Sequence, residues 1–170
     1  QSHSDARLLL IGEFESGDPV PQETIDWLRS NPAVCVAGFS KDPSNFYSIM
    51  DLLAFPSYRE GFPNVPLEAA AASIPVVGFA ATGTVDAVVN GETGMLVPLG
   101  DVAGLANAIS EYLGNDLIRF KHGQAGFTRA STEFPNEAIW DAMCNLYTSM
   151  LPENRQPAPL PGQSQTKRAA

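Results

Sequence analysis

The chain has 170 residues, of which 44% are hydrophobic and 17% are charged, and its formal net charge at pH 7 is -9. This length and hydrophobic content fit one globular domain with a sizeable core. Ten basic residues against 19 acidic ones exclude a general nucleic-acid binder, because a phosphate backbone requires a basic face.

The order of apolar runs and turn residues predicts alternating strands and helices. From the N-terminus, we expect a strand at 7–12, a helix at 22–30, a strand at 34–37, a short helix at 43–50 and a strand at 52–55. The chain continues with a helix at 65–72, a strand at 75–78, a short helix at 83–89, a strand at 95–97 and helices at 102–113, 116–131 and 136–150. The continuous apolar run at 7–12 is typical of a strand that is buried on both faces.

This alternation predicts an α/β fold with a Rossmann-like, doubly wound parallel sheet, formed by residues 7–151. Ligands of such sheets bind at the carboxyl ends of the strands, where loops meet helix N-termini. We expect residues 1–6 to be a cloning scar or linker. We expect residues 152–170 to be a disordered tail, because four of the 14 prolines lie in the last 20 residues.

Several common catalytic and metal-binding motifs are absent from the sequence. Gly12 and Gly17 have the spacing of a phosphate-binding P-loop, but Asp18 stands where that motif needs lysine. The histidines are His3 and His122, and we expect His122 to be a solvated residue of a surface helix rather than part of a hydrolytic triad. The chain has no Asp-x-Asp pair, so we expect no metal site.

The cysteines and the hydropathy bear on the cellular compartment. Cys35 and Cys144 lie far apart and form no Cys-x-x-Cys pair, so we expect buried thiols in a reducing compartment. No apolar run approaches the length of about 20 residues that a membrane-spanning helix needs. We therefore expect a cytoplasmic protein, peripheral at most to the inner face of the membrane.

The segment that follows the strand at 52–55 carries the most specific signal. Glu60 lies in the loop, Gly61 lets the backbone approach a ligand, and Asn64 is expected to cap the next helix. The free amides and partial positive charge of the helix N-terminus suit a diphosphate. Glu68, one turn inside the helix, can accept hydrogen bonds from two vicinal hydroxyls. A purely structural interpretation stays open, in which Glu60 caps the helix locally and Glu68 interacts with the helix dipole.

Glu60 and Glu68 resemble the Glu-x7-Glu motif of retaining glycosyltransferases of the GT-B fold, family 4. The surrounding sequence is similar to that family as well, with residues 51–57 before the motif and 75–78, Gly83 and 90–98 after it. The similarity extends from about Arg7 to Met150. It implies that the chain is the C-terminal, nucleotide-sugar-binding half of a two-domain GT-B enzyme.

The resemblance implies a role for each residue that matches a family motif. Glu60 would be catalytic at the donor sugar, and Glu68 would bind the ribose of the nucleotide. The remaining positions are Gly61, Phe62, Pro63, Asn64, Thr82 and Gly83 at the donor sugar and diphosphate, and Gly38, Phe39, Ser40 and Lys41 beside the base. Arg59 is expected to be structural or solvated, with a phosphate contact as the alternative.

The resemblance also implies a reaction and its partners. The donor is a nucleoside-diphosphate sugar, no cofactor takes part, and a hexose passes with retention of configuration to a glycan or a lipid-linked acceptor. The acceptor-binding domain is a separate part of the enzyme, and we expect this chain to be inactive without it. Two alternatives stay open, namely a GT-B sugar-nucleotide epimerase and a non-catalytic nucleotide-binding module.

Two further features carry structural expectations. Ser73 stands where the family usually has glycine, and a left-handed backbone there would cost about 1 kcal/mol. The helix at 136–150 carries an apolar stripe that we expect to be buried within the domain, with pairing to a second copy of the chain as the alternative. The stripe consists of Ile139, Trp140, Met143, Leu146 and Tyr147.

Overall fold

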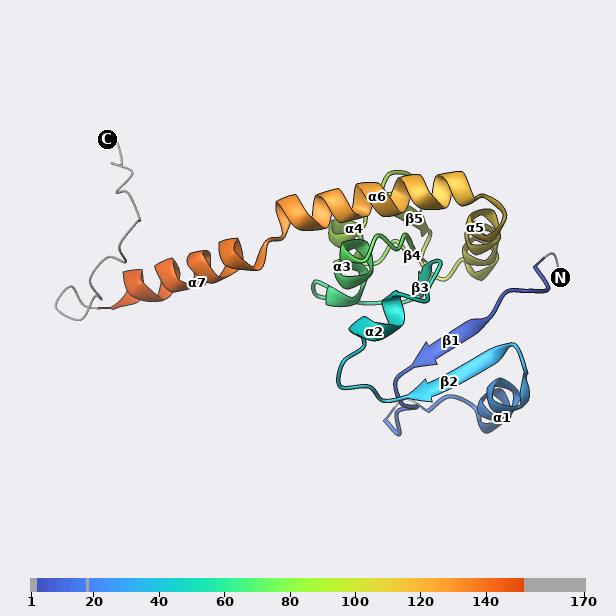
Figure 1. Ribbon diagram of the computed structural model, residues 1–170. Helices are drawn as coiled ribbons and strands as arrows, with labels where there is room; N and C mark the ends of the chain where they lie inside the picture. The colour runs from blue at the N-terminus through green and yellow to red at the C-terminus, as the bar shows by residue number, and fades with distance from the viewer. Residues whose placement is uncertain (1–2, 18, 152–170) are drawn as a thin grey trace. The chain divides into compact units, whose positions relative to one another are not determined.

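The computed structural model describes residues 3–17 and 19–151 and contains every predicted strand and helix (Figure 1). The strands are β1 (Leu8–Ile11), β2 (Val34–Gly38), β3 (Leu53–Phe55), β4 (Val76–Phe79) and β5 (Gly94–Val97). The helices are α1 (Gln22–Ser30), α2 (Ser44–Tyr47), α3 (Asn64–Ala71), α4 (Thr84–Ala87), α5 (Val102–Gly114), α6 (Asp116–Glu133) and α7 (Asn136–Met150). The chain divides into a compact unit up to Ser131 and a second unit from Thr132 onward.

All strand pairs in the described chain are parallel, which confirms the Rossmann-like α/β prediction. The prediction of one sheet is wrong in detail, because the described strands form a two-stranded sheet, β1–β2, and a separate three-stranded sheet, β3–β4–β5. β3 is an edge strand of only three residues and offers few backbone groups to a further strand. β4 is the central strand of the larger sheet, with Val76 opposite Leu53 on one side and Gly94 on the other.

The two-stranded sheet is less buried than its apolar sequence indicates. Leu8 is 42% exposed, so the expectation that the strand at 7–12 is buried on both faces is wrong. A strand is buried on both faces only when helices cover both, and here α1 is the helix that packs on β2. Cys35 and Ala37 alternate with half-buried residues along β2 and are exposed. The expectation of buried thiols is wrong as well, because Cys35 and Cys144 are both free and exposed.

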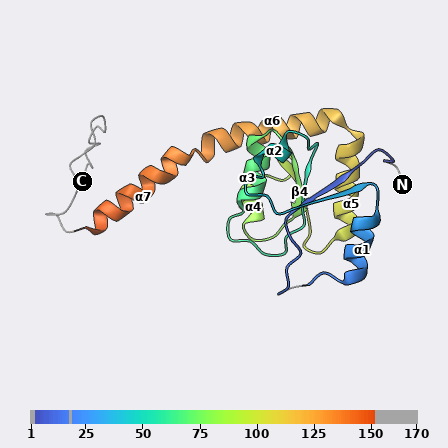
Figure 2. The same ribbon diagram turned by 60° about the horizontal axis from the view of Figure 1, so that its bottom comes forward.

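The core lies on both faces of the three-stranded sheet. Val76 belongs to a cluster with Tyr47 of α2 and Ala69 of α3, whereas its neighbour Val77 packs with Tyr112 of α5 on the opposite face. This follows from the period of two along a strand, which sends successive side chains to opposite faces. Figure 2 shows α3 and α4 on one side of β4 and α5 on the other.

Helix α6 packs closely on the C-terminal end of α3. A β-carbon built on Gly123 would lie 2.1 Å from the carbonyl oxygen of Ser73, and one on Gly126 would lie 3.3 Å from Cβ of Ala70. Beside them His122 is only 3% exposed, so the expectation of a solvated histidine is wrong. Its Nδ1 lies 2.6 Å from the hydroxyl of Tyr112, and this hydrogen bond gives the buried ring a polar partner. The sequence pattern alone places the same ring on a helix surface.

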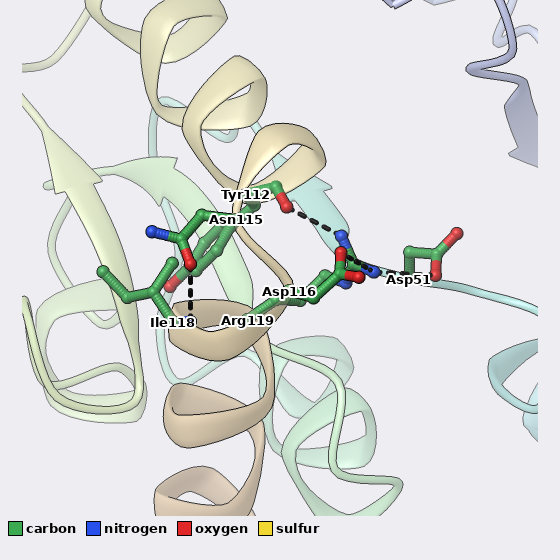
Figure 3. Close-up of polar contacts among 6 residues, drawn as sticks. All are labelled: Asp51, Tyr112, Asn115, Asp116, Ile118 and Arg119. Atoms are coloured by element: carbon green, nitrogen blue, oxygen red, sulfur yellow. Dashed lines mark hydrogen bonds and ion pairs between the residues drawn. The ribbon is translucent and has the colours of Figure 1, made fainter.

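Arg119 fixes the corner between α5 and α6 (Figure 3). Its guanidinium donates to the carbonyl oxygen of Tyr112 at 2.7 Å and pairs with Asp116 at 2.8 Å and with Asp51 at 3.7 Å. Asn115 accepts a hydrogen bond from the amide of Ile118 at 3.1 Å and so caps the start of α6. The pair with Asp51 ties this corner to the chain just before β3.

The second unit, described by itself, contains all of α7, an amphipathic helix. Within this unit its apolar stripe is about half exposed or more at Ile139, Trp140, Met143, Leu146 and Tyr147, and the expected burial of the stripe within the domain stays a prediction. A single helix cannot bury its own apolar face without a partner element. Among the residues that the structure describes, no helix combines the length and the hydropathy that a bilayer crossing requires. The tail predicted at 152–170 and residues 1–2 lie outside the described residues.

Candidate functional site

The candidate site lies at the carboxyl edge of the three-stranded sheet, where the loops after β3, β4 and β5 meet. Tyr58, in the loop after β3, packs its ring edge-on against Phe79 of β4, with ring centroids 5.3 Å apart. The same ring also reaches the loop after β5, because a β-carbon on Gly100 would lie 3.9 Å from Tyr58 Cε1. One aromatic side chain therefore connects the loop after β3 with the end of β4 and the loop after β5, at the edge where parallel sheets bind ligands.

Gly83 holds the loop after β4 directly against the loop after β3. Its φ of 81° lies in the left-handed region, and a β-carbon there would lie 2.2 Å from the carbonyl oxygen of Gly61 and 3.1 Å from that of Glu60. The contact places Thr82 and Gly83 beside Glu60 and Gly61, the grouping that the sequence predicts. A β-carbon on Gly61 would meet nothing within 4 Å, so this glycine borders open space.

Glu60 is half-buried, and one of its carboxylate oxygens is held within its own loop. Oε1 of Glu60 accepts a hydrogen bond from the Ser57 hydroxyl at 2.6 Å. A carboxylate offers about four lone-pair positions, so this bond orients the group and leaves acceptor capacity for a ligand hydroxyl. Sequence reasoning did not select Ser57, although its position three residues before Glu60 is compatible with such a local bond.

The N-terminus of α3 differs from the predicted cap. Pro63, not Asn64, occupies the capping position with extended backbone angles, and no side chain caps the helix. Proline is fixed near the φ that this position needs, so Asn64 becomes the first helical residue. Pro63 and Pro66 have no N–H, and the first turn therefore presents the amides of Asn64 and Val65 with the partial positive charge of the helix end.

Glu68 projects from α3 at the rim of a hollow between α2 and α3. Its side chain is exposed, and its Oε2 accepts a hydrogen bond from the Tyr47 hydroxyl at 2.9 Å. The hollow has a volume of about 410 Å³ and is lined by Asp42, Pro43, Ser44, Tyr47, Glu68, Ala71 and Ala72. Glu60 is not part of this lining, so the hollow contains one of the two glutamates and not both.

The hollow is an acceptor-rich environment. Asp42 accepts hydrogen bonds from the hydroxyl and the amide of Ser44, and these bonds hold the pKa of the Asp42 carboxyl below its usual range. Burial and the bond to Glu68 raise the pKa of the Tyr47 hydroxyl, which therefore stays protonated as a donor. The carboxyl groups of Asp42 and Glu68 favour hydroxyl donors in the hollow and disfavour anions, whereas the positive end of a helix dipole favours anions.

The loop after β2 lies next to this hollow. Gly38 has a φ of 74°, and its carbonyl oxygen accepts a hydrogen bond from the amide of Gly12 at 2.8 Å. Phe39 is 68% exposed, Lys41 is exposed, and Ser40 donates to the carbonyl oxygen of Asp42 at 2.9 Å. The predicted base-flanking loop is thus joined to the Glu68 side of the site through Asp42.

Arg59 is exposed beside Glu60, and its role stays a prediction. Over residues 3–17 and 19–151, no three His, Cys, Asp or Glu side chains gather in a way that could hold a metal ion. Like Ser57, Tyr47 was not selected from the sequence, because it lies 21 positions from Glu68 and only the tertiary fold brings the two together.

Comparisons with known proteins place the chain among enzymes of sugar transfer. The family model described as glycosyl transferases group 1 matches residues 1–115. The capsular polysaccharide biosynthesis glycosyltransferase CapM of Staphylococcus aureus is 35% identical over 88% of this chain and 40% of its own length. The lipopolysaccharide core biosynthesis glycosyltransferase LpsE of Rhizobium meliloti is 31% identical over 84% of this chain and 42% of its own length.

Solved structures agree with this result. Anabaena HepE in complex with UDP-glucose superposes with a TM-score of 0.79 and 25% identity, over 86% of this chain and 42% of HepE. The sucrose-phosphate synthase of Thermosynechococcus elongatus superposes with a TM-score of 0.75 and 32% identity, over 84% of this chain and 38% of the synthase. The chain therefore spans about two fifths of the length of the relatives it matches.

Proposed function

Because this chain belongs to the group 1 glycosyl transferases, a family of the GT-B type, we propose that it is the C-terminal, donor-binding domain of a retaining glycosyltransferase. It binds a nucleoside-diphosphate sugar so that a hexose can pass to a glycan or lipid-linked acceptor. HepE, which has been crystallised with UDP and with UDP-glucose, and CapM, a capsular polysaccharide glycosyltransferase, support this donor and acceptor class.

The observation that carries the proposal is the junction of two loops at the start of α3. Gly83 packs on the backbone of Glu60 and Gly61, and the next residues lead into a helix N-terminus with two free amides and no side-chain cap. A diphosphate suits these amides, because they are donors at the positive end of the helix dipole. Glu60 and Glu68 then flank the diphosphate with hydroxyl acceptors, one before the helix and one within its second turn.

The proposed roles follow from these positions. Glu60, oriented by Ser57, contacts hydroxyls of the donor sugar and is the catalytic carboxylate. The stretch Gly61, Phe62, Pro63 and Asn64, together with Thr82 and Gly83, lines the donor sugar and diphosphate. Glu68 accepts hydrogen bonds from the ribose, and the loop of Gly38, Phe39, Ser40 and Lys41 flanks the base.

The proposed reaction breaks the bond between the anomeric carbon and the diphosphate oxygen, and the electron pair leaves with the nucleoside diphosphate. The acceptor oxygen bonds to the anomeric carbon, and its proton passes to the oxygen of the departing diphosphate. The amides at the start of α3 stabilise the charge that develops on this leaving group. We propose that no further cofactor takes part, that the remaining length of the enzyme supplies the acceptor-binding domain, and that the enzyme works on the cytoplasmic side.

A titration with nucleotides and nucleotide sugars tests the proposal. UDP-, GDP- and ADP-glucose and the free diphosphates are added to the isotopically labelled chain while its amide NMR spectrum is recorded. At least one donor should bind and shift the amides of 60–68 and 82–83, with little change in α1. The proposal would be contradicted if a large excess of each donor left all amide resonances in place. It would also be contradicted if the shifted resonances lay only in other parts of the chain.

The same donors separate the proposed function from its alternatives. An epimerase would release free sugar from the donor when the complete enzyme is incubated without an acceptor, whereas a glycosyltransferase should form product only when a hydroxyl acceptor is added. A binding module would do neither.

A further inference from the structure

Tyr47 is buried although its hydroxyl reaches the rim of the site. The residue ends α2, its side chain is 7% exposed, and its ring packs in the cluster that contains Ala69, Val76 and Val88. A ring enclosed by core side chains has few orientations. The position of its hydroxyl is therefore set by the core and not by the loop around it.

The hydroxyl of Tyr47 donates a hydrogen bond to the carboxylate of Glu68. The bond to Oε2 is 2.9 Å long and joins α2 to α3. Glu68 is otherwise an exposed side chain with three rotatable bonds, which in water would sample many rotamers. A bond from a fixed donor selects those rotamers that direct the carboxylate toward the hollow and leaves Oε1 to a ligand.

The surroundings of the bond favour a role in binding over a role in packing alone. The hollow beside it has a volume of about 410 Å³, and Tyr47 and Glu68 line it together with Asp42. Glu68 does not need the tyrosine for solvation, because its side chain is exposed to water. The bond therefore contributes orientation to the carboxylate more than it relieves a buried charge.

We propose that Tyr47 is a positioning residue for the nucleotide, which holds the Glu68 carboxylate in the orientation that accepts hydrogen bonds from the two vicinal hydroxyls of the ribose. The inference rests on the proposed function, since it concerns the same donor site. Pre-orientation of Glu68 lowers the conformational cost of binding a diol. Tyr47 thus sets the preference of the site for a ribonucleotide over a nucleotide that lacks these hydroxyls.

The test compares a ribonucleotide with its 2′,3′-dideoxy counterpart by calorimetry. UDP, GDP and ADP are titrated first, and the diphosphate that binds is used for all variants. The original chain should prefer the ribonucleotide by about tenfold or more, and Tyr47→Phe should reduce this preference by about threefold to tenfold, because one oriented charge-assisted contact is lost. Tyr112→Phe is the matched control, since it also removes a buried tyrosine hydroxyl but lies on the other face of the sheet.

The outcomes distinguish the two proposals. If no diphosphate binds the original chain, the proposed function fails and this inference fails with it. If the original chain prefers the ribonucleotide and Tyr47→Phe keeps the full preference, the proposed function stands and the role of Tyr47 is wrong. Tyr112→Phe should lose stability and keep the preference, whereas a merely structural role of Tyr47 would make the two variants alike.

A second measurement does not depend on the folding of Tyr47→Phe. The Cζ resonance of labelled Tyr47 should shift in Glu68→Ala, an exposed substitution, while that of Tyr112 stays in place. In the double variant of Tyr47→Phe and Glu68→Ala, the tyrosine substitution should cause no further loss of the ribonucleotide preference. An unchanged Tyr47 resonance, or additive losses in the double variant, would overturn the inference.

Discussion

At the scale of single residues, the site depends on side chains and glycines whose surroundings are set by other segments. Glu60 and Glu68 each receive one hydrogen bond, from Ser57 and Tyr47 respectively. Each hydroxyl binds one carboxylate oxygen and leaves the other oxygen for a ligand. These bonds therefore orient the carboxylates and leave part of their acceptor capacity available. Gly83 contributes through the absence of a side chain, because only glycine allows its contact with the neighbouring loop.

Removal of the Glu68 carboxylate should weaken donor binding. We expect Glu68→Ala to lower the affinity for the nucleotide sugar by about tenfold or more, because charge-assisted hydrogen bonds to the ribose contribute about 1.5–3 kcal/mol each. Calorimetric titration of the original chain and the variant measures the change. Glu92→Ala, at an exposed glutamate in the turn before β5, is the control and should bind with unchanged affinity. Equal affinities for the original chain and Glu68→Ala would remove Glu68 from the site.

A side chain at Gly83 should disrupt both stability and the site. We expect Gly83→Ala to lower the free energy of unfolding by about 2–4 kcal/mol, from the left-handed backbone and from overlap with Gly61. Gly91→Ala is the control, since Gly91 has a φ of 77° but open space around it, and it should lose only about 1 kcal/mol. Urea denaturation followed by circular dichroism gives both values, and equal losses would contradict the proposed loop contact.

The buried His122 should make stability depend on pH. Burial and the nearby Lys121 lower the pKa of its imidazole, although Glu111 acts in the opposite direction. Its Nδ1 shares a hydrogen bond with the Tyr112 hydroxyl at 2.6 Å. Below about pH 6.5 the unfolded chain binds a proton that the folded chain resists, so the free energy of unfolding should fall with decreasing pH until the lowered folded-state pKa is passed.

Urea midpoints between pH 7.5 and pH 5 measure this dependence. His122→Gln removes the titrating group, so the urea midpoint of this variant should change less over the same pH range. The variant should also be less stable than the original chain at pH 7.5. A variant that keeps the full slope would assign the pH dependence to other groups.

At the scale of elements, α3 is the helix that organises the site, and both of its ends are fixed. Its N-terminus follows the loop held by Gly83, and its C-terminus ends in a Schellman motif with Ser73 at the left-handed position. The amide of Ile74 donates a hydrogen bond to the carbonyl oxygen of Ala69 at 2.8 Å. The amide of Ser73 donates one to the carbonyl oxygen of Ala70, also at 2.8 Å. Gly123 of α6 packs against this end, so the helix cannot shift along its axis without losing both contacts.

The backbone of Ser73 is left-handed, with a φ of 62°, so the cost that the sequence analysis attached to this conformation applies and leads to a stabilising substitution. We expect Ser73→Gly to raise the free energy of unfolding by about 1 kcal/mol, because glycine adopts this conformation without strain. Ser48→Gly, at a residue with a right-handed φ of -64°, is the control and should lower stability. Denaturant midpoints of the two variants should move in opposite directions, and a destabilised Ser73→Gly would show that the serine is not strained.

At the scale of the whole molecule, the chain accounts for about two fifths of its relatives, and its candidate site is open. Glu68 and Phe62 are exposed, and the hollow beside Glu68 is bordered by residues of α2 and α3. Transfer requires an acceptor hydroxyl held at about 3–3.5 Å from the anomeric carbon. A donor site without a surface opposite to it can bind its ligand but cannot supply that alignment.

We therefore expect the chain by itself to bind a nucleotide sugar without transferring the hexose. Incubation with the donor that binds and with polysaccharide or lipid-linked acceptors should release no nucleoside diphosphate above the rate without protein. The complete enzyme provides the positive control. Turnover by the 170-residue chain alone, at a rate comparable to that of the complete enzyme, would show that the acceptor site lies within it.

The sequence by itself determined the order and type of the elements, the parallel α/β class and the position of the glutamate motif after β3. These features depend on local periodicity, turn residues and motif spacing, which are properties of neighbouring residues in the chain.

Only the tertiary structure decided which residues support the site and which are buried. Tyr47 meets Glu68, Gly83 meets Gly61, and Tyr112 meets His122 through contacts between separate segments, and no local pattern specifies such pairs. Exposure of Cys35 likewise follows from how many helices cover the small sheet, and not from the apolar run in which the cysteine lies. Burial and pairing depend on what other parts of the chain place against a residue, and this is the physical reason why they could not be inferred from spacing alone.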